Sequence, residues 1–334
     1  MTTARRDKIV LVTGTAGFIG FHLANRLLSL GYRVIGIDNI TDYYDPKIKI
    51  KRNKILLAFP EYKFYKKNIA DFKVLNSIVK KEEPKAIVHL AAQAGVRYSL
   101  TNPWAYAESN YLGTLNIFEA AKVNKIKRVI FASSSSVYGK NKEMPFSESH
   151  TVDHPISIYA ASKKANEVLA HSYHHLYNIE TAGLRFFTVY GEYGRPDLAL
   201  FKFTKNILLD KPIDVYNGGE MARDFTYVGD IADGIIAALN KKDLKYEIYN
   251  FGGDNPIALM TFIRLIEGHL GKKAKLNLLP MQQGDVKETF ADISKARREL
   301  DFNPKVKINE GIKRFLDWFL ENRDWLLKLK DGKQ

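Results

Sequence analysis

A tyrosine and a lysine four residues apart are the pair in this sequence whose types and spacing point most directly to chemistry. Tyr159 and Lys163 fall in the predicted helix Ser157–Tyr177, and residues four apart share one face of a helix. A free phenol has a pKa of about 10, so it acts as a base near neutral pH only if a nearby positive charge lowers that pKa. The pair therefore predicts a proton-transfer site. The alternative is an ordinary pair of side chains on a surface helix.

Four consecutive serines, Ser133 to Ser136, stand ahead of that helix, at the end of the predicted buried strand Arg128–Ser133. Ligands of parallel sheets bind beyond the carboxyl ends of the strands. The serines therefore bring hydroxyl groups, which both donate and accept hydrogen bonds, to a place where a ligand is expected.

A glycine-rich turn follows the first predicted strand, Lys8–Val12, and precedes a helical pattern from Phe21 to Leu30. Gly14, Gly17 and Gly20 have the spacing G-x-x-G-x-x-G. Glycines in such a turn let the backbone approach a pyrophosphate, which the N-terminus of the helix attracts. In this context of strand and helix the turn predicts a dinucleotide site, whereas a glycine triplet alone would indicate no more than a tight turn.

An aspartate follows the next predicted strand, Arg33–Ile37, 18 positions after Gly20. The carboxylate of Asp38 can accept hydrogen bonds from the hydroxyls of an adenosine ribose, and its charge would repel a 2′-phosphate. The sequence therefore favours NAD over NADP as the dinucleotide.

Strand and helix patterns alternate along the first 190 residues, and most of the strands are apolar runs. Further strands are predicted at Tyr62–Lys66, Ala86–Leu90 and Thr181–Leu184, and further helices at Phe72–Lys81 and Pro103–Val123. Such alternation is typical of a parallel sheet covered by helices on both faces. We expect an α/β fold, a Rossmann-type doubly wound parallel sheet, with its ligand site after Val12, Leu90 and Ala132.

The 334 residues are enough for about two domains. Residues 7–190 are expected to form the NAD-binding domain, and residues 191–330 mainly a smaller α/β substrate lobe, part of which could return to the first domain. Strands of this second part are predicted at Ile213–Tyr216, Glu247–Phe251 and Lys275–Leu279, and helices at Leu198–Leu209, Val228–Leu239, Leu259–Leu270 and Ile308–Leu327.

Composition narrows the classes of partner and compartment. The net charge of +14, densest at Lys47–Lys54, would suit a nucleic-acid or membrane surface, or a solvated lysine-rich exterior that attracts an anionic nucleotide. The run matches no nucleic-acid-binding motif, so we expect neither nucleic acid nor membrane as a partner. Cysteine is absent, which excludes disulfides and thiolate chemistry. The N-terminus lacks a long apolar segment, and we expect a cytoplasmic protein.

From Thr13 to about Arg298 the chain resembles the extended short-chain dehydrogenase/reductase family, and within it the NAD-dependent nucleotide-sugar epimerases. The motifs that carry the resemblance are the glycine turn, Asp38-Asn39, His89-Leu90-Ala91-Ala92, the serines before Val137-Tyr138-Gly139, Tyr159-x-x-x-Lys163, Arg185 to Gly191, Arg223-Asp224-Phe225 and Gly284-Asp285. The segments Asp38–Asp45, Gln93–Ser99 and Met281–Val286 are similar to those of UDP-glucuronate 4-epimerases.

The resemblance implies roles for individual residues. Tyr159 would take the proton from a sugar hydroxyl while C4 gives a hydride to NAD, Lys163 would lower the pKa of that phenol and hold the nicotinamide ribose, and Ser134 would bond the same sugar oxygen. The expected NAD contacts are Gly14, Gly17, Phe18, Ile19, Gly20, Asp38, Asn39, Asn68, Ile69, Leu90, Ala91, Ala92, Gln93, Asn110, Ser133, Tyr159, Lys163 and Phe186.

The resemblance also implies a UDP-sugar substrate. Ser134, Ser135, Ser136 and Thr188 would hold the C6 carboxylate of a UDP-hexuronic acid, with Arg97 as an added charge or a loop-ordering residue. Arg195 and Arg223 would bind the diphosphate, Asp285 the uridine ribose and Tyr216 the uracil; salt bridges and core packing are the alternatives for these four. Dehydratases of the family carry an acid pair where this chain has Ser135 and Ser136, so dehydration is disfavoured.

Several alternatives remain at this stage. A 4-epimerase of neutral UDP-sugars, a UDP-glucuronate decarboxylase and a redox-sensing regulator of the same fold would share most of the motifs, although such regulators usually lose the tyrosine or the lysine. No metal is expected, because His171, His174 and His175 fall on one helix without a pattern of partner carboxylates. By resemblance we expect a homodimer formed through two helices of the sheet domain.

Overall fold

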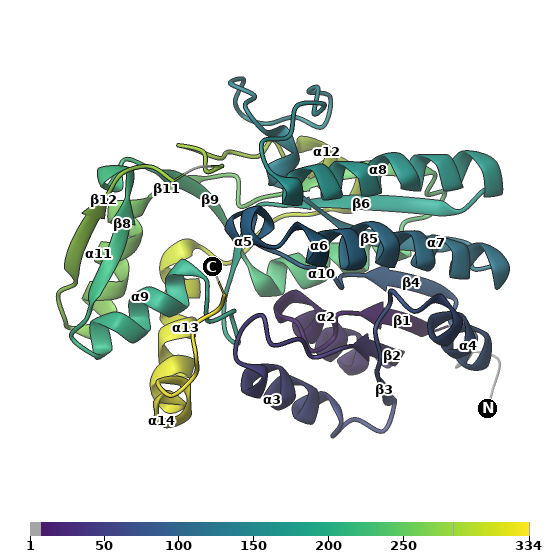
Figure 1. The fold of residues 1–334 in the computed structure, drawn as a ribbon, viewed down its shortest axis with the longest axis horizontal. Helices are drawn as coiled ribbons and strands as arrows, with labels where there is room; N and C mark the ends of the chain where they lie inside the picture. Colours follow the sequence, from purple (N-terminus) through teal and green to yellow (C-terminus); the bar gives the residue numbers. More distant parts are fainter. Residues whose placement is uncertain (1–7, 283, 334) are drawn as a thin grey trace.

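The computed structural model describes residues 8–282 and 284–333. Its largest sheet has seven strands, all parallel, in the order β10-β6-β5-β4-β1-β2-β3 (Figure 1). The strands are β1 (Ile9–Thr13), β2 (Arg33–Asp38), β3 (Tyr62–Lys66), β4 (Ala86–His89), β5 (Arg128–Ser134), β6 (Glu180–Phe186) and β10 (Tyr246–Phe251). This sheet confirms the predicted doubly wound α/β fold.

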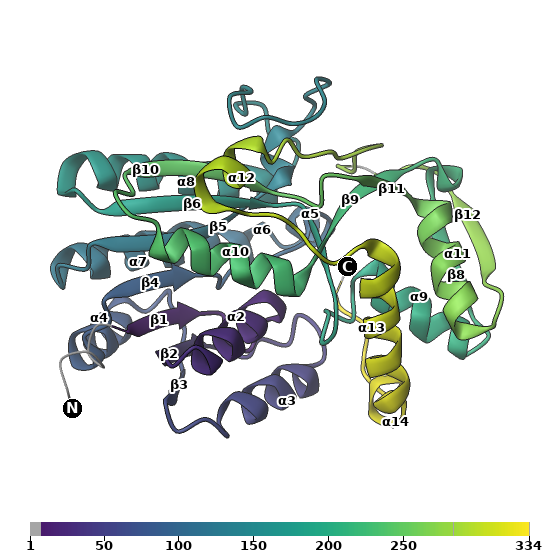
Figure 2. The same cartoon turned by 180° about the vertical axis from the view of Figure 1, so that it is seen from behind.

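Helices cover both faces of the sheet, which explains why central strands such as β1 and β4 are almost entirely apolar and buried. In β1, Val10 and Val12 pack into a core with α2 (Phe18–Ser29) and α10 (Val228–Asn240). Ile9 and Leu11 point to the other face. There they join a core with α4 (Phe72–Glu82), α7 (Gly113–Val123) and α8 (Ile158–Tyr177). Figures 1 and 2 show these two helical layers from opposite sides.

The basic run Lys47–Lys54 lies in a helix that the sequence analysis did not predict, α3 (Pro46–Leu56). Its alternating lysines and isoleucines have a period of two, which hides the helical period of 3.6. The start signal is nevertheless present, because Asp45 caps the helix by accepting from the amide of Lys47, and Pro46 occupies the first turn. Two basic residues of the run, Lys49 and Arg52, are buried rather than solvated.

The predicted long helix at Pro103–Val123 is continuous but changes its winding. It begins as α6 (Pro103–Tyr106), widens into the π-helical segment η1 (Ala107–Leu112) and continues as α7. A short helix, α5 (Val96–Thr101), precedes it. Single π-helical turns within α-helices often occur at functional sites.

A lobe with its own core packs beside the carboxyl ends of the strands, on the left in Figure 1. It contains α9 (Ala199–Leu208), α11 (Leu259–Leu270), α13 (Ile308–Glu321) and α14 (Arg323–Leu326), with the parallel pair β8 (Pro212–Tyr216) and β12 (Lys275–Leu279). The small sheet β11-β9-β7 joins it to the main body through β7 (Thr188–Tyr190), β9 (Ala222–Tyr227) and β11 (Pro256–Ala258). Between elements of the lobe, the chain returns to the main sheet in α10, β10 and α12 (Ser294–Leu300). Residues 191–330 therefore contribute to both the lobe and the main body.

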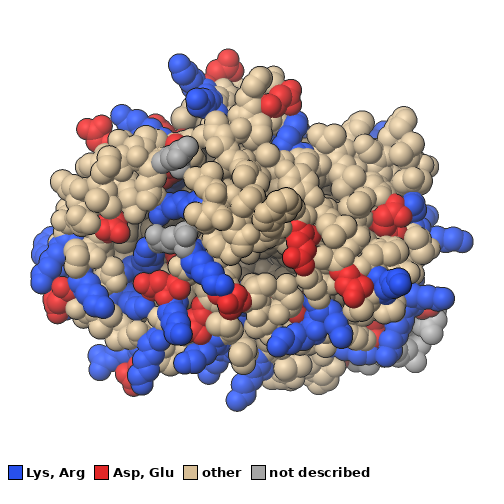
Figure 3. Space-filling model, in the orientation of Figure 1, with Lys and Arg blue, Asp and Glu red and all other residues tan. Residues whose placement is uncertain are grey.

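The surface in Figure 3 divides into two kinds. Lys and Arg are spread over its lower half, interspersed with Asp and Glu, while the region over α6 and α8 is largely uncharged. The exposed large apolar side chains of the described residues include Trp104 of α6 and Val168 and Leu176 of α8. Within residues 8–282 and 284–333, none of the helices combines the length and apolar character that a membrane span requires.

Candidate active site

A cavity of about 500 Å³ opens at the carboxyl ends of β1, β4 and β5, where the sequence placed the ligand site. It brings together every residue predicted to contact NAD except Asn110. Asn110 lies behind the wall in η1, fully buried, and its side chain holds both backbone groups of Gln93, at 2.8 and 3.0 Å. It therefore positions the wall of this cofactor cavity rather than lining it.

The glycine turn is shaped by contacts that only glycine permits. Gly14 has φ +77°, and a Cβ on it would lie 2.8 Å from the backbone nitrogen of Ala91. A Cβ on Gly20 would lie 2.0 Å from the carbonyl oxygen of Gly14. The residues at the start of α2, Gly17 to Gly20, line the cavity, so the positive end of the helix dipole faces it. No side chain caps this end of the helix, which leaves its first amides free to bind an anion. A pyrophosphate would fit this turn.

Asp38 stands at the end of β2 on the rim of the same cavity. Its two carboxylate oxygens accept from the backbone amides of Ala16, at 3.1 Å, and Ile40, at 2.7 Å. These bonds fix the carboxylate beside the glycine turn, where the ribose of a bound dinucleotide would lie. The residues present therefore fit a dinucleotide cofactor.

The helix α8 carries the predicted proton-transfer pair, and Ser157 caps its start by accepting from the amide of Ala160 at 3.1 Å. Lys163 is buried, and its ammonium group donates to the carbonyl of Ala132 at 2.8 Å. Burial lowers the pKa of Lys163 to about 8. Burial raises the pKa of Tyr159, while a hydrogen bond with Ser134 and the charge of Arg195 act in the opposite direction.

The serines divide into two groups. Ser133 donates to the carboxylate of Glu167 at 2.6 Å, so its hydroxyl is committed to the fold. Ser134, Ser135 and Ser136 follow at the cavity wall, with the hydroxyls of Ser134 and Ser136 3.2 Å apart. These three side chains offer hydrogen bonds next to Tyr159 but no carboxylate for acid-base work.

A buried ion pair fastens α8 to the sheet beneath it. Arg185 of β6 donates to both carboxylate oxygens of Glu167, each at 2.9 Å, and both side chains are about 3% exposed. A third bond joins Arg185 to the hydroxyl of Tyr138 at 2.9 Å. Because Glu167 is one helical turn beyond Lys163, this pair sets the position of the proton-transfer residues relative to β5 and β6.

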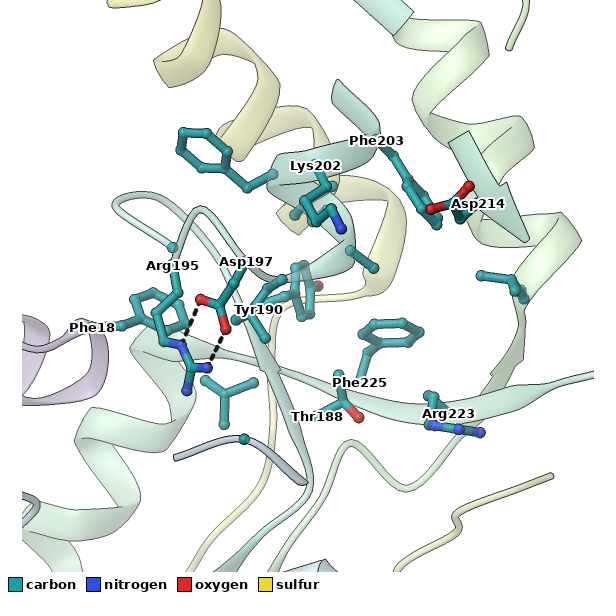
Figure 4. Close-up of a pocket in the computed structure, with 18 of the residues that line it drawn as sticks. Phe18, Thr188, Tyr190, Arg195, Asp197, Lys202, Phe203, Asp214, Arg223 and Phe225 are labelled. Carbon is teal, nitrogen blue, oxygen red and sulfur yellow. Dashed lines mark hydrogen bonds and ion pairs between the residues drawn. The ribbon is translucent and has the colours of Figure 1, made fainter. Parts of the chain in front are cut away.

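A second cavity, of about 370 Å³, lies between the sheet and the lobe (Figure 4). Its wall includes Arg97, Thr188, Arg195, Tyr216, Arg223 and Asp285, all predicted to contact the substrate. The guanidinium of Arg97 lies over the ring of Tyr216, 4.7 Å from its centroid. This stacking places Arg97 at Tyr216 in the second cavity rather than beside the serines.

Two residues expected to hold different parts of the nucleotide are bonded to each other. Arg223 donates to Asp285 at 2.7 Å and to the carbonyl of Val286 at 2.7 Å. Both side chains are partly exposed in the wall of the second cavity. The salt bridge that the sequence analysis gave as the alternative for these residues is therefore present. Arg223 and Asp285 nevertheless both line the second cavity.

The two cavities meet, because eight residues line both of them. These are Phe18, Tyr43, Gly95, Val96, Thr188, Val189, Arg195 and Leu198. Arg195 is paired through two hydrogen bonds with Asp197, as Figure 4 shows. The charge of Asp197 and the hydrogen bonds between them keep the pKa of Arg195 above its ordinary value, while Arg195 lowers that of Asp197.

Residues that the sequence analysis missed also build this site. Lys49 lines the cofactor cavity and bonds the carbonyl and hydroxyl of Thr41 at 2.9 and 2.8 Å. Arg52, fully buried, donates to the carbonyl of Ala16 in the glycine turn and to that of Tyr193, at 2.9 and 2.6 Å. The helix start signal at Asp45 and Pro46 was the available clue to both.

The remaining predicted positions have ordinary environments. Asn68 lines the cofactor cavity and donates to Glu108 at 2.8 Å. His171 packs against Tyr246, and His174 bonds the carbonyl of Ile179 at 3.0 Å. No three His, Asp or Glu side chains gather as a metal site in the part of the chain that the structure describes.

Comparison with known proteins places this site in a family. The model of the NAD dependent epimerase/dehydratase family matches residues 10–252. An uncharacterized protein of Methanocaldococcus jannaschii is 59% identical over 96% of this chain and 99% of its own length. A UDP-glucuronate 4-epimerase of Thermodesulfobacterium geofontis is 46% identical over 96% of this chain and 98% of its own.

A solved structure agrees with these relatives. The UDP-glucuronic acid 4-epimerase of Bacillus cereus, in complex with UDP-glucuronic acid and NAD, superposes with a TM-score of 0.89. It is 35% identical and covers 94% of this chain and 99% of its own. The family expected from the glycine turn and the Tyr159–Lys163 pair is thus confirmed, and the chain belongs to the NAD dependent epimerase/dehydratase family.

Proposed function

We propose that this protein catalyses the reversible 4-epimerisation of UDP-glucuronate to UDP-galacturonate with bound NAD. The observation that carries the proposal is that Tyr159 stands beside the hydroxyl of Ser134 in the cofactor cavity, and that this cavity meets the second one. The relatives named UDP-glucuronate 4-epimerase, similar over nearly the whole chain, support the same substrate.

Tyr159 would accept the proton of the sugar C4 hydroxyl, and Ser134 would hold the same oxygen by a hydrogen bond. When bound, NAD supplies the acceptor for the C4 hydride and the donor that returns it. Epimerisation requires the 4-keto sugar to present its opposite face before the hydride returns. The sugar subsite must therefore release and rebind the ring while the UDP portion stays anchored.

Lys163 would support Tyr159 through its charge and would contact the nicotinamide ribose. Its ammonium is held at the carbonyl of Ala132, inside the cofactor cavity. With a pKa of about 8 it remains charged at neutral pH. Burial raises the pKa of Tyr159, so this charge, together with Ser134 and Arg195, must lower that pKa when NAD is bound.

The serine hydroxyls suit a sugar acid that must be gripped in two orientations. Ser134, Ser135 and Ser136, together with Thr188, would hydrogen-bond the C6 carboxylate of the hexuronic acid. Hydroxyl groups can rotate to serve either orientation, whereas a fixed guanidinium fork would favour one. None of the three serines can remove the C5 proton and expel a hydroxide, so dehydration is not expected.

The lobe would anchor the UDP portion in the second cavity. Arg195 and Arg223 would bind the diphosphate, whose oxygens match guanidinium geometry. Asp285 would hold the uridine ribose, and Tyr216, backed by Arg97, would lie against the uracil.

The test is incubation of the purified protein with UDP-glucuronate and NAD, followed by separation of the products and their assignment by NMR. Formation of UDP-galacturonate without UDP-xylose is the expected result. Conversion of UDP-glucose or UDP-N-acetylglucosamine alone would favour a 4-epimerase of neutral sugars, and UDP-xylose would indicate a decarboxylase. Either outcome would refute the proposal.

We propose in addition that the protein is a cytoplasmic homodimer joined through α7 and α8. Leu115 of α7 and Val168 and Leu176 of α8 are exposed, at 38%, 55% and 64%. Sedimentation analysis should give twice the mass of the chain, and Val168→Glu should shift it toward the monomer. A monomeric wild type at micromolar concentration would refute the interface, and cell fractionation tests the compartment.

A further inference from the structure

The last described segment of the chain, Leu329–Lys333, leaves the lobe and reaches the rim of the active-site cleft. Leu329 is buried in the lobe core, and Lys205 of α9 holds its carbonyl at 2.7 Å and Asp331 at 2.9 Å. These contacts anchor the start of the segment. We call residues 329–333 the closing segment.

Beyond Leu329 the closing segment binds the loop between β2 and α3. The amide of Lys330 donates to the carboxylate of Asp45 at 3.0 Å, and the amide of Lys333 donates to the carbonyl of Tyr43 at 2.8 Å. A side-chain contact adds to them, since Lys333 pairs with Asp42 at 2.9 Å. Two of the three bonds are made by backbone amides of the segment, so substitution of its side chains would leave them in place.

The loop held in this way belongs to both cavities. Tyr43 lines the cofactor cavity and the second cavity, and its hydroxyl donates to Asp197 at 3.3 Å. Asp197 in turn binds Arg195 through two hydrogen bonds. Tyr43 therefore connects the loop that starts at the cofactor rim with the arginine at the centre of the cleft.

The closing segment also touches the other end of this connection. A Cβ on Gly332 would lie 2.7 Å from the Cβ of Asp197, so the backbone of the segment packs directly on the aspartate. Lys333 lines the second cavity next to it. The segment thus contacts Tyr43 on one side and Asp197 on the other, across the hydrogen bond that joins them.

We infer that the closing segment is a positioning element for substrate binding: it clamps Tyr43 against Asp197 and thereby orients Arg195 toward the nucleotide. The inference rests on the proposed function insofar as Arg195 contacts the diphosphate of a UDP-sugar. It adds that the geometry of the cleft depends on residues 329–333, which lie outside residues 10–252, the part that the family model matches.

The closing segment is expected to affect substrate binding more than the stability of the fold, because most of it lies outside the core of the lobe. Lys330, Asp331 and Lys333 are exposed, and the apolar anchors of the lobe end at Leu329. Loss of residues beyond Leu329 should therefore lower thermal stability little, while Tyr43 and Asp197 gain freedom. An arginine that must be ordered by its ligand binds that ligand more weakly.

The decisive variant carries a stop codon at position 330, which retains the buried Leu329. Its dissociation constant for UDP, measured by calorimetry on the NAD-loaded protein, should rise about tenfold, the effect of losing roughly one well-placed hydrogen bond to a charged group. The KM for UDP-glucuronate should rise similarly, while kcat stays within about threefold, because Tyr159 and Lys163 lie elsewhere.

A matched variant distinguishes positioning from simple attraction of an anion. Lys330→Ala combined with Lys333→Ala removes the same two ammonium groups but keeps both backbone bonds. It should weaken UDP binding by no more than about threefold, because exposed charges are screened by salt. Gly332→Val, which forces the segment away from Asp197, should instead weaken UDP binding as the truncation does.

Two results would overturn the inference. One is a truncated protein whose UDP dissociation constant and KM stay within about twofold of wild type, whatever its melting temperature. The other is a double lysine variant as weak as the truncation, which would assign the effect to charge. Because UDP binding requires no turnover, the outcome stands even if the wild type fails to epimerise UDP-glucuronate, a failure that would refute only the proposed function.

Discussion

The cofactor cavity and the second cavity are built by different means. The first is built around the turn between β1 and α2, where Gly14 and Gly20 leave no room for a Cβ. The second is made of side-chain pairs between distant segments, such as Arg223 with Asp285 and Arg97 with Tyr216. One cavity is therefore set by short local motifs, and the other by how the lobe folds against the sheet.

The largest expected effect comes from the proton-transfer residue in the wall of the cofactor cavity. Tyr159→Phe should lower kcat by about 10³-fold or more, within the range for loss of a general base, because the phenol oxygen is removed. NAD content, measured after denaturation of the purified protein, should stay near wild type, since the glycine turn is untouched. Turnover near the wild-type rate would show that another group is the base.

The buried ion pair between Glu167 of α8 and Arg185 of β6 is expected to have the second largest effect, on the stability of the fold. Glu167→Gln should lower the free energy of unfolding by about 3–5 kcal/mol, because the buried guanidinium of Arg185 loses its counter-charge. Urea denaturation measures this. Arg26→Ala, which removes the exposed pair with Asp233, should cost less than about 1 kcal/mol and serves as the control. Equal effects would mean that burial of the pair is unimportant.

The pKa of Lys163 makes the stability of the cofactor cavity depend on pH. Its pKa is about 8 in the folded protein and about 10.4 when exposed, so burying the ammonium penalises the fold below pH 8 by roughly 3 kcal/mol. That penalty disappears as pH rises from 8 to about 10.5, because the unfolded chain then binds more protons. The stability advantage of Lys163→Met over wild type, without cofactor, should shrink over this interval. A constant difference would contradict the assignment.

The smallest expected effect concerns the side-chain pairs of the second cavity. Arg223→Ala should raise the KM for the UDP-sugar by about 10- to 100-fold, the loss of one charged hydrogen-bonding group, while NAD binding is unchanged. Tyr216→Leu offers a matched comparison, since it removes an aromatic platform without changing charge. If Arg223→Ala weakened NAD as much as the UDP-sugar, the two cavities would not be independent in the way their construction suggests.

Much of the fold was predictable because its signals are local. Apolar strands and the glycine turn predicted the doubly wound sheet, and β3, α11 and β12 have the predicted bounds. The helix α3 was not predicted, because its alternating lysines and isoleucines mimic a strand. The small sheet of β7, β9 and β11 was missed as well, because strands of three to six residues have too short a sequence pattern and are stabilised by pairing with distant strands.

The sequence by itself determined the chemistry available to this protein. Residue types at short spacing, the glycine turn, Asp38, the serines and Tyr159 with Lys163, define what can bind and react, because neighbours in a helix or turn are placed by local geometry. The tertiary structure alone decided which side chains are neutralised or held by partners far along the chain. Burial and long-range packing produce three such contacts: Asp197 pairs with Arg195, Arg52 bonds the glycine turn, and Lys333 bonds the backbone of Tyr43. No local spacing encodes such contacts.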